Sequence, residues 1–281
     1  MKLTFEHHGN RCSCETTDAK SIAIKMDFDG PQPNHFGTEK ASSSVLKIGG
    51  FTGDTSTGGG CNVDTLKLIP HCNGTHTETV SHIVNEDIWI GHAAMGVVGV
   101  AMLITVEPVL AKEAEGQSYR PALAETDKLV TASQIEKAVA RVGDAKKVKP
   151  DALIIRTMPN SVDKRSSAYS EKNYPAFLSI EAIKKVNEIG VRHLLLDLPS
   201  VDRMYDDGLL TNHHLFWNVD EKTHTLGKAT EQDKTITEMI FVEDEVEDGL
   251  FVLNIQVPAF CSDAAPSRPV IMPLKMTALK N

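Results

Sequence analysis

The densest group of potential metal ligands lies in His71-Cys72-Asn73-Gly74-Thr75-His76-Thr77-Glu78-Thr79-Val80-Ser81-His82. Within it, Cys72, His76, Glu78 and His82 follow one another at steps of four, two and four residues. Because side chains alternate between the two faces of an extended strand, even steps place all four groups on one face. The β-branched residues between them favour an extended chain. A thiolate, two imidazoles and a carboxylate on one face suit a first-row divalent metal ion, so the segment predicts a metal site.

A second polar group follows the apolar stretch Leu194-Leu195-Leu196. Asp197-Leu198-Pro199-Ser200-Val201-Asp202 comes directly after it, and His213 and His214 lie further along. Ligands of α/β sheets bind at the carboxyl ends of the strands, so this loop is expected at the site. The two histidines are adjacent, so only one can face the site, and the sequence leaves open which one. Turn or cap hydrogen bonds are an equally good explanation for the two aspartates.

Glu238 is a charged residue in an apolar-flanked segment, Thr235-Ile236-Thr237-Glu238-Met239-Ile240. The surrounding stretch from 231 to 248 is rich in Asp and Glu, and most of it is expected to be a solvated face. A carboxylate that enters a core usually meets a cation or a metal ion there. Glu238 is therefore a further candidate ligand.

The composition is that of a globular protein and argues against two kinds of partner. The formal net charge is −9, and Lys and Arg form no block that would grip nucleic acid. The most apolar run, 93–106, is shorter than the ~20 residues that a membrane helix needs. The start of the chain has no apolar signal segment. The five cysteines are odd in number and widely spread, which is typical of reduced thiols in a cytoplasmic protein.

The elements that must position these side chains alternate late in the chain. A capping box at Thr131 predicts a helix, and 152–155 is expected to be a buried strand. A second helix is expected from Ser179 to Gly190, followed by strands at 191–196 and 250–257. This strand, helix, strand order predicts a β-α-β unit, but the earlier strands are not followed by helices. The expected class is α/β with a mixed sheet, in a single domain over 1–281 that includes the polar strand and loop region 1–60.

The histidine-rich segment resembles the His-x-Gly-Thr-His-x-Asp-x-Pro-x-His motif of the cyclase family, which includes bacterial kynurenine formamidases. Gly74-Thr75-His76 and His82 match this motif, whereas Cys72, Glu78 and Val80 replace its first His, its Asp and its Pro. Cysteine and glutamate are competent zinc ligands. His71 is one residue out of register and takes the place of Cys72 if the chain bulges there, so the first ligand stays open between the two.

The resemblance extends over most of the chain. Further similar segments are Leu153-Ile154-Ile155-Arg156-Thr157, 174–190, 197–202, His213, Thr237-Glu238-Met239-Ile240 and Asp263-Ala264-Ala265-Pro266-Ser267-Arg268-Pro269. It implies a swivelling β/β/α cyclase-type fold with a mixed, barrel-like sheet and flanking helices. It also implies a homodimer or homotetramer with a zinc or manganese centre, held by Cys72, His76, Glu78, His213 and Glu238. The longer separation of His213 and Glu238 implies an insertion around 219–230.

Such a centre implies hydrolysis of a small amide, cyclic amide or lactone, as in the arylformamidase step of tryptophan catabolism. The metal ion would lower the pKa of bound water from about 15.7 towards about 7 and polarise the carbonyl. His82 would act as general base. N-formylkynurenine is the family's best-known substrate and isatin-type rings are also used. Phe36, Trp89 and Trp217 are the candidates for stacking on an aryl ring.

Two alternatives remain open. The departures from the motif are also those of a catalytically silent binding protein whose metal site has drifted. Alternatively, Cys72 next to His71 and His76 is the nucleophile of a thiol hydrolase. Other templates are absent from the sequence, among them Gly-x-Ser-x-Gly, His-Glu-x-x-His and Gly-x-Gly-x-x-Gly.

Overall fold

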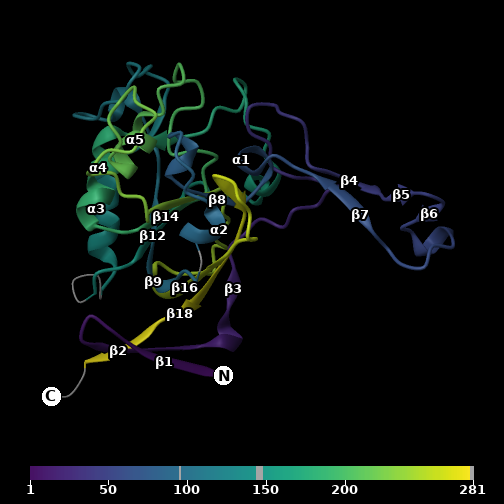
Figure 1. Ribbon diagram of the computed structural model, residues 1–281. Coiled ribbons are helices and arrows are strands. Elements are labelled where there is room, and N and C mark those ends of the chain that lie inside the picture. The colour runs from purple at the N-terminus through teal and green to yellow at the C-terminus, as the bar shows by residue number, and fades with distance from the viewer. Residues whose placement is uncertain (95, 144–147, 279–281) are drawn as a thin grey trace.

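The computed structural model describes residues 1–94, 96–143 and 148–278 and is built on one mixed, curled sheet (Figure 1). Its strands, in spatial order, are β17 (Ala264–Pro266), β8 (His76–Glu78), β15 (Thr235–Glu238), β14 (His193–Leu196), β12 (Ala152–Thr157), β9 (Val98–Val106), β16 (Gly249–Gln256), β18 (Arg268–Pro273) and β3 (Lys20–Ser21). The central strands β15, β14, β12 and β9 are parallel, whereas both flanks pair antiparallel. The expected α/β class with a mixed sheet is confirmed.

The central strands are buried on both faces, which is why they read as continuous apolar runs. All six residues of β12 are buried, and they alternate between two cores. Leu153 and Ile155 pack under the helices, whereas Ala152 and Ile154 face the opposite core with Phe251. This alternation follows from the two-residue period of a strand.

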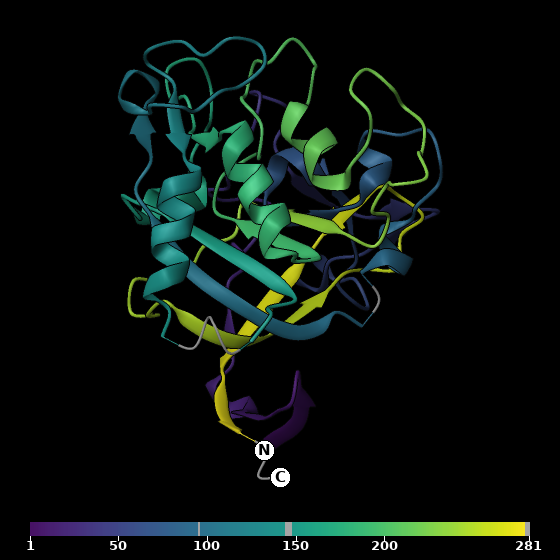
Figure 2. The same ribbon diagram turned by 90° about the vertical axis from the view of Figure 1, so that its left-hand side faces the viewer.

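Three helices cover one face of the sheet: α3 (Ala132–Arg141), α4 (Ile180–Ile189) and α5 (Thr211–Trp217), shown teal to green in Figure 2. The predicted capping box starts α3, with Thr131 accepting from the backbone N–H of Gln134. The Ser179 hydroxyl caps α4 by accepting from Ala182. Gly190 ends α4 at a φ of 78°, a left-handed conformation that favours glycine. Both helix predictions are confirmed.

The prediction of one extended strand over 72–82 is wrong. Pro70–Asn73 form a helical turn, α1, only His76–Glu78 are strand, and Val80–His82 form a 3-10 turn, η3. Pro70 stands at the first helical position, where its fixed φ favours a turn and its missing N–H costs nothing. The Thr79 hydroxyl accepts from the N–H of Ser81 and so starts the second turn.

Two smaller parts extend from the body, an arm made of two two-stranded sheets and a separate three-stranded sheet (Figure 1). A long hairpin arm consists of β4 (Ser42–Val45), β5 (Lys47–Ile48), β6 (Phe51–Thr52) and β7 (Asp64–Lys67). At the other end, β1 (Lys2–His7), β2 (Asn10–Glu15) and β19 (Lys275–Ala278) bring the two terminal regions together. The strand β7, which leads into the histidine-rich segment, is thus part of the arm and does not enter the main sheet.

The remaining elements are short. They are a small sheet of β10 (Val109–Leu110), β11 (Lys128–Val130) and β13 (Phe177–Leu178), the helix α2 (Ile90–Ala93), and 3-10 turns at Thr16–Asp18, Thr55–Thr57, Ala111–Glu113 and Val162–Ser166. Among the described residues, no helix has the length and apolar character needed to cross a lipid bilayer.

Candidate metal centre

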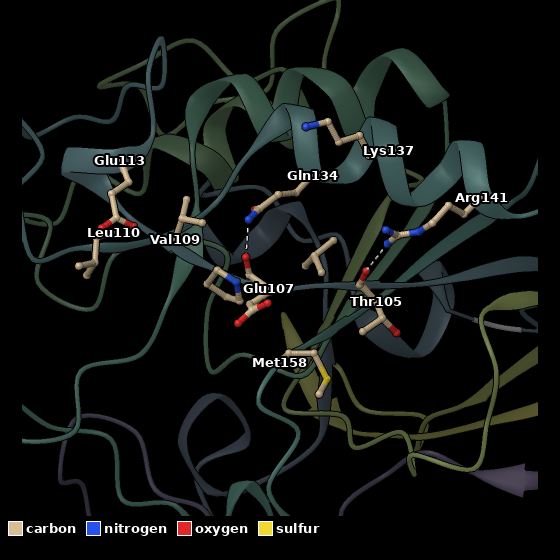
Figure 3. A pocket seen from close by; sticks show the side chains of 11 residues that line it. Thr105, Glu107, Val109, Leu110, Glu113, Gln134, Lys137, Arg141 and Met158 are labelled. Carbon is tan, nitrogen blue, oxygen red and sulfur yellow. Dashed lines mark hydrogen bonds between the residues drawn. The ribbon is translucent and has the colours of Figure 1, made fainter.

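Two hollows near the carboxyl ends of the central strands differ in their chemistry. The larger, about 630 Å³, is an open groove between β9 and α3, where Gln134 and Arg141 bond the backbone carbonyls of Glu107 and Thr105 (Figure 3). It contains no histidine or cysteine. The smaller, about 90 Å³, shares no lining residue with it and is lined by His35, Phe36, His71, His82, Pro199, Ser200, Asp202, Arg203, Met204, Asp206, Leu210, His213 and Glu238. The ligand-type side chains are concentrated here.

Strand pairing brings the first of these groups together. β8 lies between β17 and β15, and its register places His76 opposite Glu238. The Nε2 atom of His76 lies 3.4 Å from Oε2 of Glu238. Both side chains are buried, and Nδ1 of His76 is 3.0 Å from the carbonyl oxygen of Gly74. That contact turns Nε2 towards the carboxylates.

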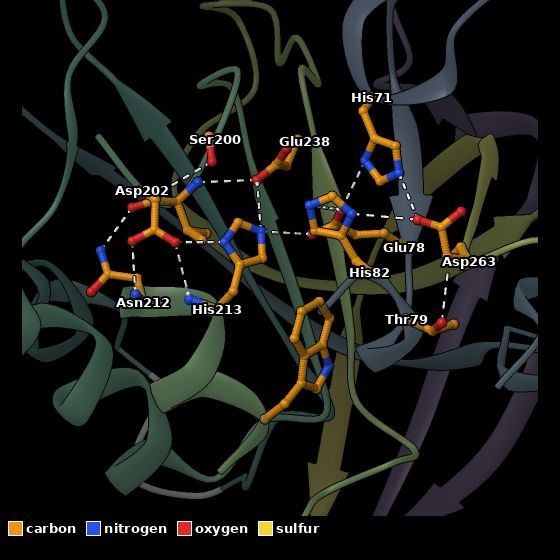
Figure 4. Close-up of polar contacts among 12 residues, drawn as sticks. His71, Glu78, Thr79, His82, Ser200, Asp202, Asn212, His213, Glu238 and Asp263 are labelled. Carbon is orange, nitrogen blue, oxygen red and sulfur yellow. Dashed lines mark hydrogen bonds and ion pairs between the residues drawn. The ribbon is translucent and has the colours of Figure 1, made fainter. Parts of the chain in front are cut away.

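Glu78 is the centre of the cluster (Figure 4). Its carboxylate is fully buried, with Oε1 at 2.9 Å from Nε2 of His213 and Oε2 at 3.0 Å from Nδ1 of His71. Nε2 of His82 is 4.0 Å from Oε2. Burial raises the pKa of Glu78, but the charges of His82 and His213 outweigh it and hold this pKa well below its usual range. The carboxylate is therefore ionised and ready to bind a cation.

The ring of His213 is oriented by Asp202. Oδ2 of Asp202 lies 2.6 Å from Nδ1 of His213, and the same carboxylate accepts from the backbone N–H groups of Asn212 and His213 at the start of α5. Asp202 is thus both a helix cap and the partner of an imidazole. An imidazole whose Nδ1–H donates to a carboxylate presents Nε2 as a metal ligand. His213, and not its neighbour His214, faces Glu78 and Glu238.

Asp263 joins the site from the residue before β17. Its Oδ2 atom accepts from Nε2 of His71 at 2.8 Å and lies 3.3 Å from Nδ1 of His82, and the two rings stack with centroids 4.2 Å apart. Burial lowers the pKa of His71, but Asp263 and Glu78 outweigh it and raise this pKa to about 10. Asp263 is a site residue that was not predicted from the sequence, although it is the first residue of the similar segment 263–269.

The structure distinguishes between His71 and Cys72, the two candidates for the first ligand, by the direction of their side chains. Successive helical residues point about 100° apart, and the α1 turn directs His71 to Glu78. Cys72 belongs to none of the ligand-type groups found among the described residues, which are His71-His76-Glu78, His71-His82-Asp263 and Glu78-His82-His213. Burial raises the pKa of the Cys72 thiol. A thiol that is protonated and buried is a poor nucleophile, which disfavours the thiol-hydrolase alternative.

The residues present fit a divalent ion. Nε2 of His76 and Oε2 of Glu78 are buried and make no hydrogen bond of good geometry. A buried polar atom left unpaired costs about 1–3 kcal/mol, which a coordinated cation would remove. Each of the three groups holds its ligand atoms within 4.8 Å of one another. Imidazole and carboxylate donors suit zinc and manganese.

Of the three aromatic candidates, only Phe36 lines the cavity. Trp217 is fully buried, and its ring packs 5.6 Å from that of His213 while its Nε1–H donates to the carbonyl of Lys234. Trp89 precedes α2 and is not among the lining residues. His35, which the sequence analysis did not single out, lines the cavity beside Phe36.

Comparison with known proteins identifies the family of this chain and several structures with a similar fold. The model of the family described as "Putative cyclase" matches residues 15–203. Similar solved structures include a predicted metal-dependent hydrolase from Bacillus stearothermophilus (14% identity, 90% of this chain and 97% of that one, TM-score 0.56). Others are a novel cyclase (14%, 92% and 90%, TM-score 0.60) and an isatin hydrolase bound to the product analogue thioisatinate (13%, 92% and 94%, TM-score 0.58). No curated protein matches the chain.

The fold and the site define a class of protein, a mixed α/β fold of the cyclase type with a cluster of His, Glu and Asp side chains at the edge of the sheet. The chain belongs to the cyclase family. The family match ends at residue 203, so it does not cover His213, Glu238 and Asp263, whose positions at the site come from the contacts described above.

Proposed function

We propose that this protein hydrolyses a small aryl amide or cyclic amide, in the manner of a kynurenine formamidase or an isatin hydrolase. The observation that carries the proposal is the convergence of buried imidazoles and carboxylates around Glu78, with the partly exposed His82–Asp263 pair at the cavity. Buried ion pairs contribute little net stability, so this cluster of buried imidazoles and carboxylates is better explained by the binding of a cation than by a role in folding.

His71, His76, Glu78, His213 and Glu238 would hold one or two divalent ions of zinc or manganese. When bound, such an ion lowers the pKa of a coordinated water and polarises the scissile carbonyl. In this ligand set the first ligand is His71 and not Cys72, the choice that the sequence left open.

We assign general acid–base catalysis to His82. It is bound at Nδ1 by Asp263, and this fixes the ring so that Nε2 faces the carboxylate of Glu78. His82 would accept a proton from the attacking water and return it to the leaving nitrogen. Asp263 acts through His82 as a positioning residue, as Asp202 does for His213.

The test is a measurement of metal content and turnover on the purified chain. We expect stoichiometric zinc or manganese, hydrolysis of N-formylkynurenine or isatin, loss of both after dialysis against a chelator, and recovery when either metal is restored. Protein without bound metal, and without any gain on adding it, would instead support a silent binding protein with the same fold.

A further inference from the structure

His35 is a buried imidazole at the cavity that the proposed mechanism does not use. It is 3% exposed, and its Nε2 atom has no hydrogen-bond partner. It lines the same hollow as His71, His82 and Glu238. Buried polar atoms in folded proteins are nearly always paired, so an unpaired one at a cavity marks a position for a ligand atom.

Backbone hydrogen bonds of His35 and of its neighbour Asn34 fix the chain at this position. The N–H of His35 donates to the carbonyl of Cys72 at 3.0 Å, which ties it to the turn that carries His71. On its other side, the N–H of Asn34 donates to Ser167 and the carbonyl of Asn34 accepts from Tyr169. The His35 ring stacks on Phe36 with centroids 3.9 Å apart and meets Tyr169 edge-on. The imidazole is therefore held in place before any ligand binds.

Phe36 has an unusual conformation at the mouth of the cavity. Its φ is +62°, a left-handed value that is rare for a bulky residue, and its side chain is 50% exposed. The ring meets that of Tyr205, which is also exposed, at 6.1 Å. A strained residue that exposes half of an apolar ring gains little for folding, and such strain is concentrated at functional sites.

We propose that Nε2 of His35 donates a hydrogen bond to a substrate carbonyl other than the scissile one, while Phe36 and Tyr205 contact the aryl ring of the substrate. This inference rests on the proposed function. In the proposed function, His82 and the metal ligands act on the scissile amide. His35 lies on a separate segment, so its Nε2–H is available to a second carbonyl of the substrate. In N-formylkynurenine and isatin this second acceptor is the ketone carbonyl, so His35 is inferred to be the residue that recognises a group these substrates share.

Two substrates separate this role from a structural one. 2-Formamidoacetophenone carries the ketone, and formanilide is the same amide without it. In the metal-loaded enzyme, His35→Phe keeps an aromatic ring but removes the donor. We expect kcat/KM for the ketone substrate to fall about tenfold, mainly through KM, as for the loss of one hydrogen bond. For formanilide we expect a change of less than about twofold.

The controls are His35→Gln and the metal content. Gln keeps a donor, so it should recover part of the selectivity for the ketone substrate, and both variants should bind as much metal as the unchanged chain. An equal loss on both substrates, or a loss of metal in His35→Phe, would overturn the proposal, because it would show a structural or ligating role.

Failure of the proposed function gives a different result. If the unchanged chain hydrolyses neither amide, binding of the corresponding products decides the role of His35, and the hydrolase proposal itself fails only if N-formylkynurenine and isatin are not hydrolysed either. Calorimetry would then compare 2-aminoacetophenone with aniline. Weaker binding of the ketone alone in His35→Phe supports the inference, whereas equal binding in both proteins, or none, contradicts it.

Discussion

At the residue scale, the direction of each imidazole ring depends on which of its two nitrogens already has a hydrogen-bond partner. Nδ1 of His76 contacts the carbonyl of Gly74, and Nδ1 of His213 contacts Asp202. In both residues Nε2 is therefore the atom that faces the carboxylates of Glu238 and Glu78. His82 differs, because its Nδ1 is paired with Asp263 and its ring is about one quarter exposed. This exposure suits a group that exchanges protons with a substrate.

His82→Ala tests the proton-transfer role. We expect the variant to keep its metal, while turnover falls by about 10²–10⁴-fold, the usual contribution of a general base. Metal content by mass spectrometry and kcat on N-formylkynurenine check both points. Asp263→Asn should give a smaller loss, because it removes only the group that orients the ring. Full activity in His82→Ala would remove this residue from the mechanism.

His71 and Cys72 are distinguished by a matched pair of variants. Because His71 contacts Glu78 and Asp263, His71→Ala should weaken metal binding by more than about tenfold, the scale at which even the outer partners of ligands matter. Cys72→Ser should leave metal affinity nearly unchanged. Competition with a chromogenic chelator measures both. The opposite order of the two effects would restore Cys72 as the ligand.

At the element scale, the ends of β8 and β15, the α1 turn and the start of α5 act as one support. Their positions follow from sheet pairing and from the capping of α5 by Asp202. The neighbouring strands β14 and β15 are also joined by a buried side-chain pair, in which Nδ1 of His193 lies 2.9 Å from the hydroxyl oxygen of Thr235. Burial, with a further contribution from Arg192, lowers the pKa of His193 to about 4.

This buried histidine predicts a loss of stability in acid. The unfolded chain has the higher pKa, about 6.5, so it binds the proton first, and stability falls as the pH drops from 6.5 towards 4. At pH 5 this effect lowers the free energy of unfolding by about 2 kcal/mol relative to neutral pH. His193→Gln cannot titrate and should lose correspondingly less stability between pH 7.5 and 5. Urea unfolding of both proteins at the two pH values measures the difference, and parallel losses would contradict it.

At the scale of the whole molecule, the centre connects segments that are far apart in the chain. His71 and Glu78 precede the strands β9, β12 and β14 in the chain, whereas His213 and Glu238 follow them. An ion bound among them would therefore crosslink the sheet, α1 and α5. The oligomeric state, a homodimer or homotetramer, and the cytoplasmic location stay predictions.

Metal removal tests this crosslink. An ion that binds only the folded chain stabilises it by about 4 kcal/mol when its free concentration is 1,000 times Kd. We expect the chelated protein to melt roughly 10 °C lower than the loaded one. Differential scanning calorimetry measures the shift. Glu78→Gln is the control, because it should melt at nearly the same temperature with and without metal.

The class of the fold, the two capped helices and the buried strands could be predicted from the sequence, as could the imidazole and carboxylate types of most candidate ligands. These are local properties, because periodicity, helix caps and residue chemistry depend only on residues that are close together in the sequence. The choice of His71 over Cys72 and of His213 over His214, the position of Asp263 and that of His35 at the cavity required the three-dimensional arrangement. The physical reason is that a helical turn at Pro70–Asn73, the strand register and contacts between distant segments set the direction of each side chain.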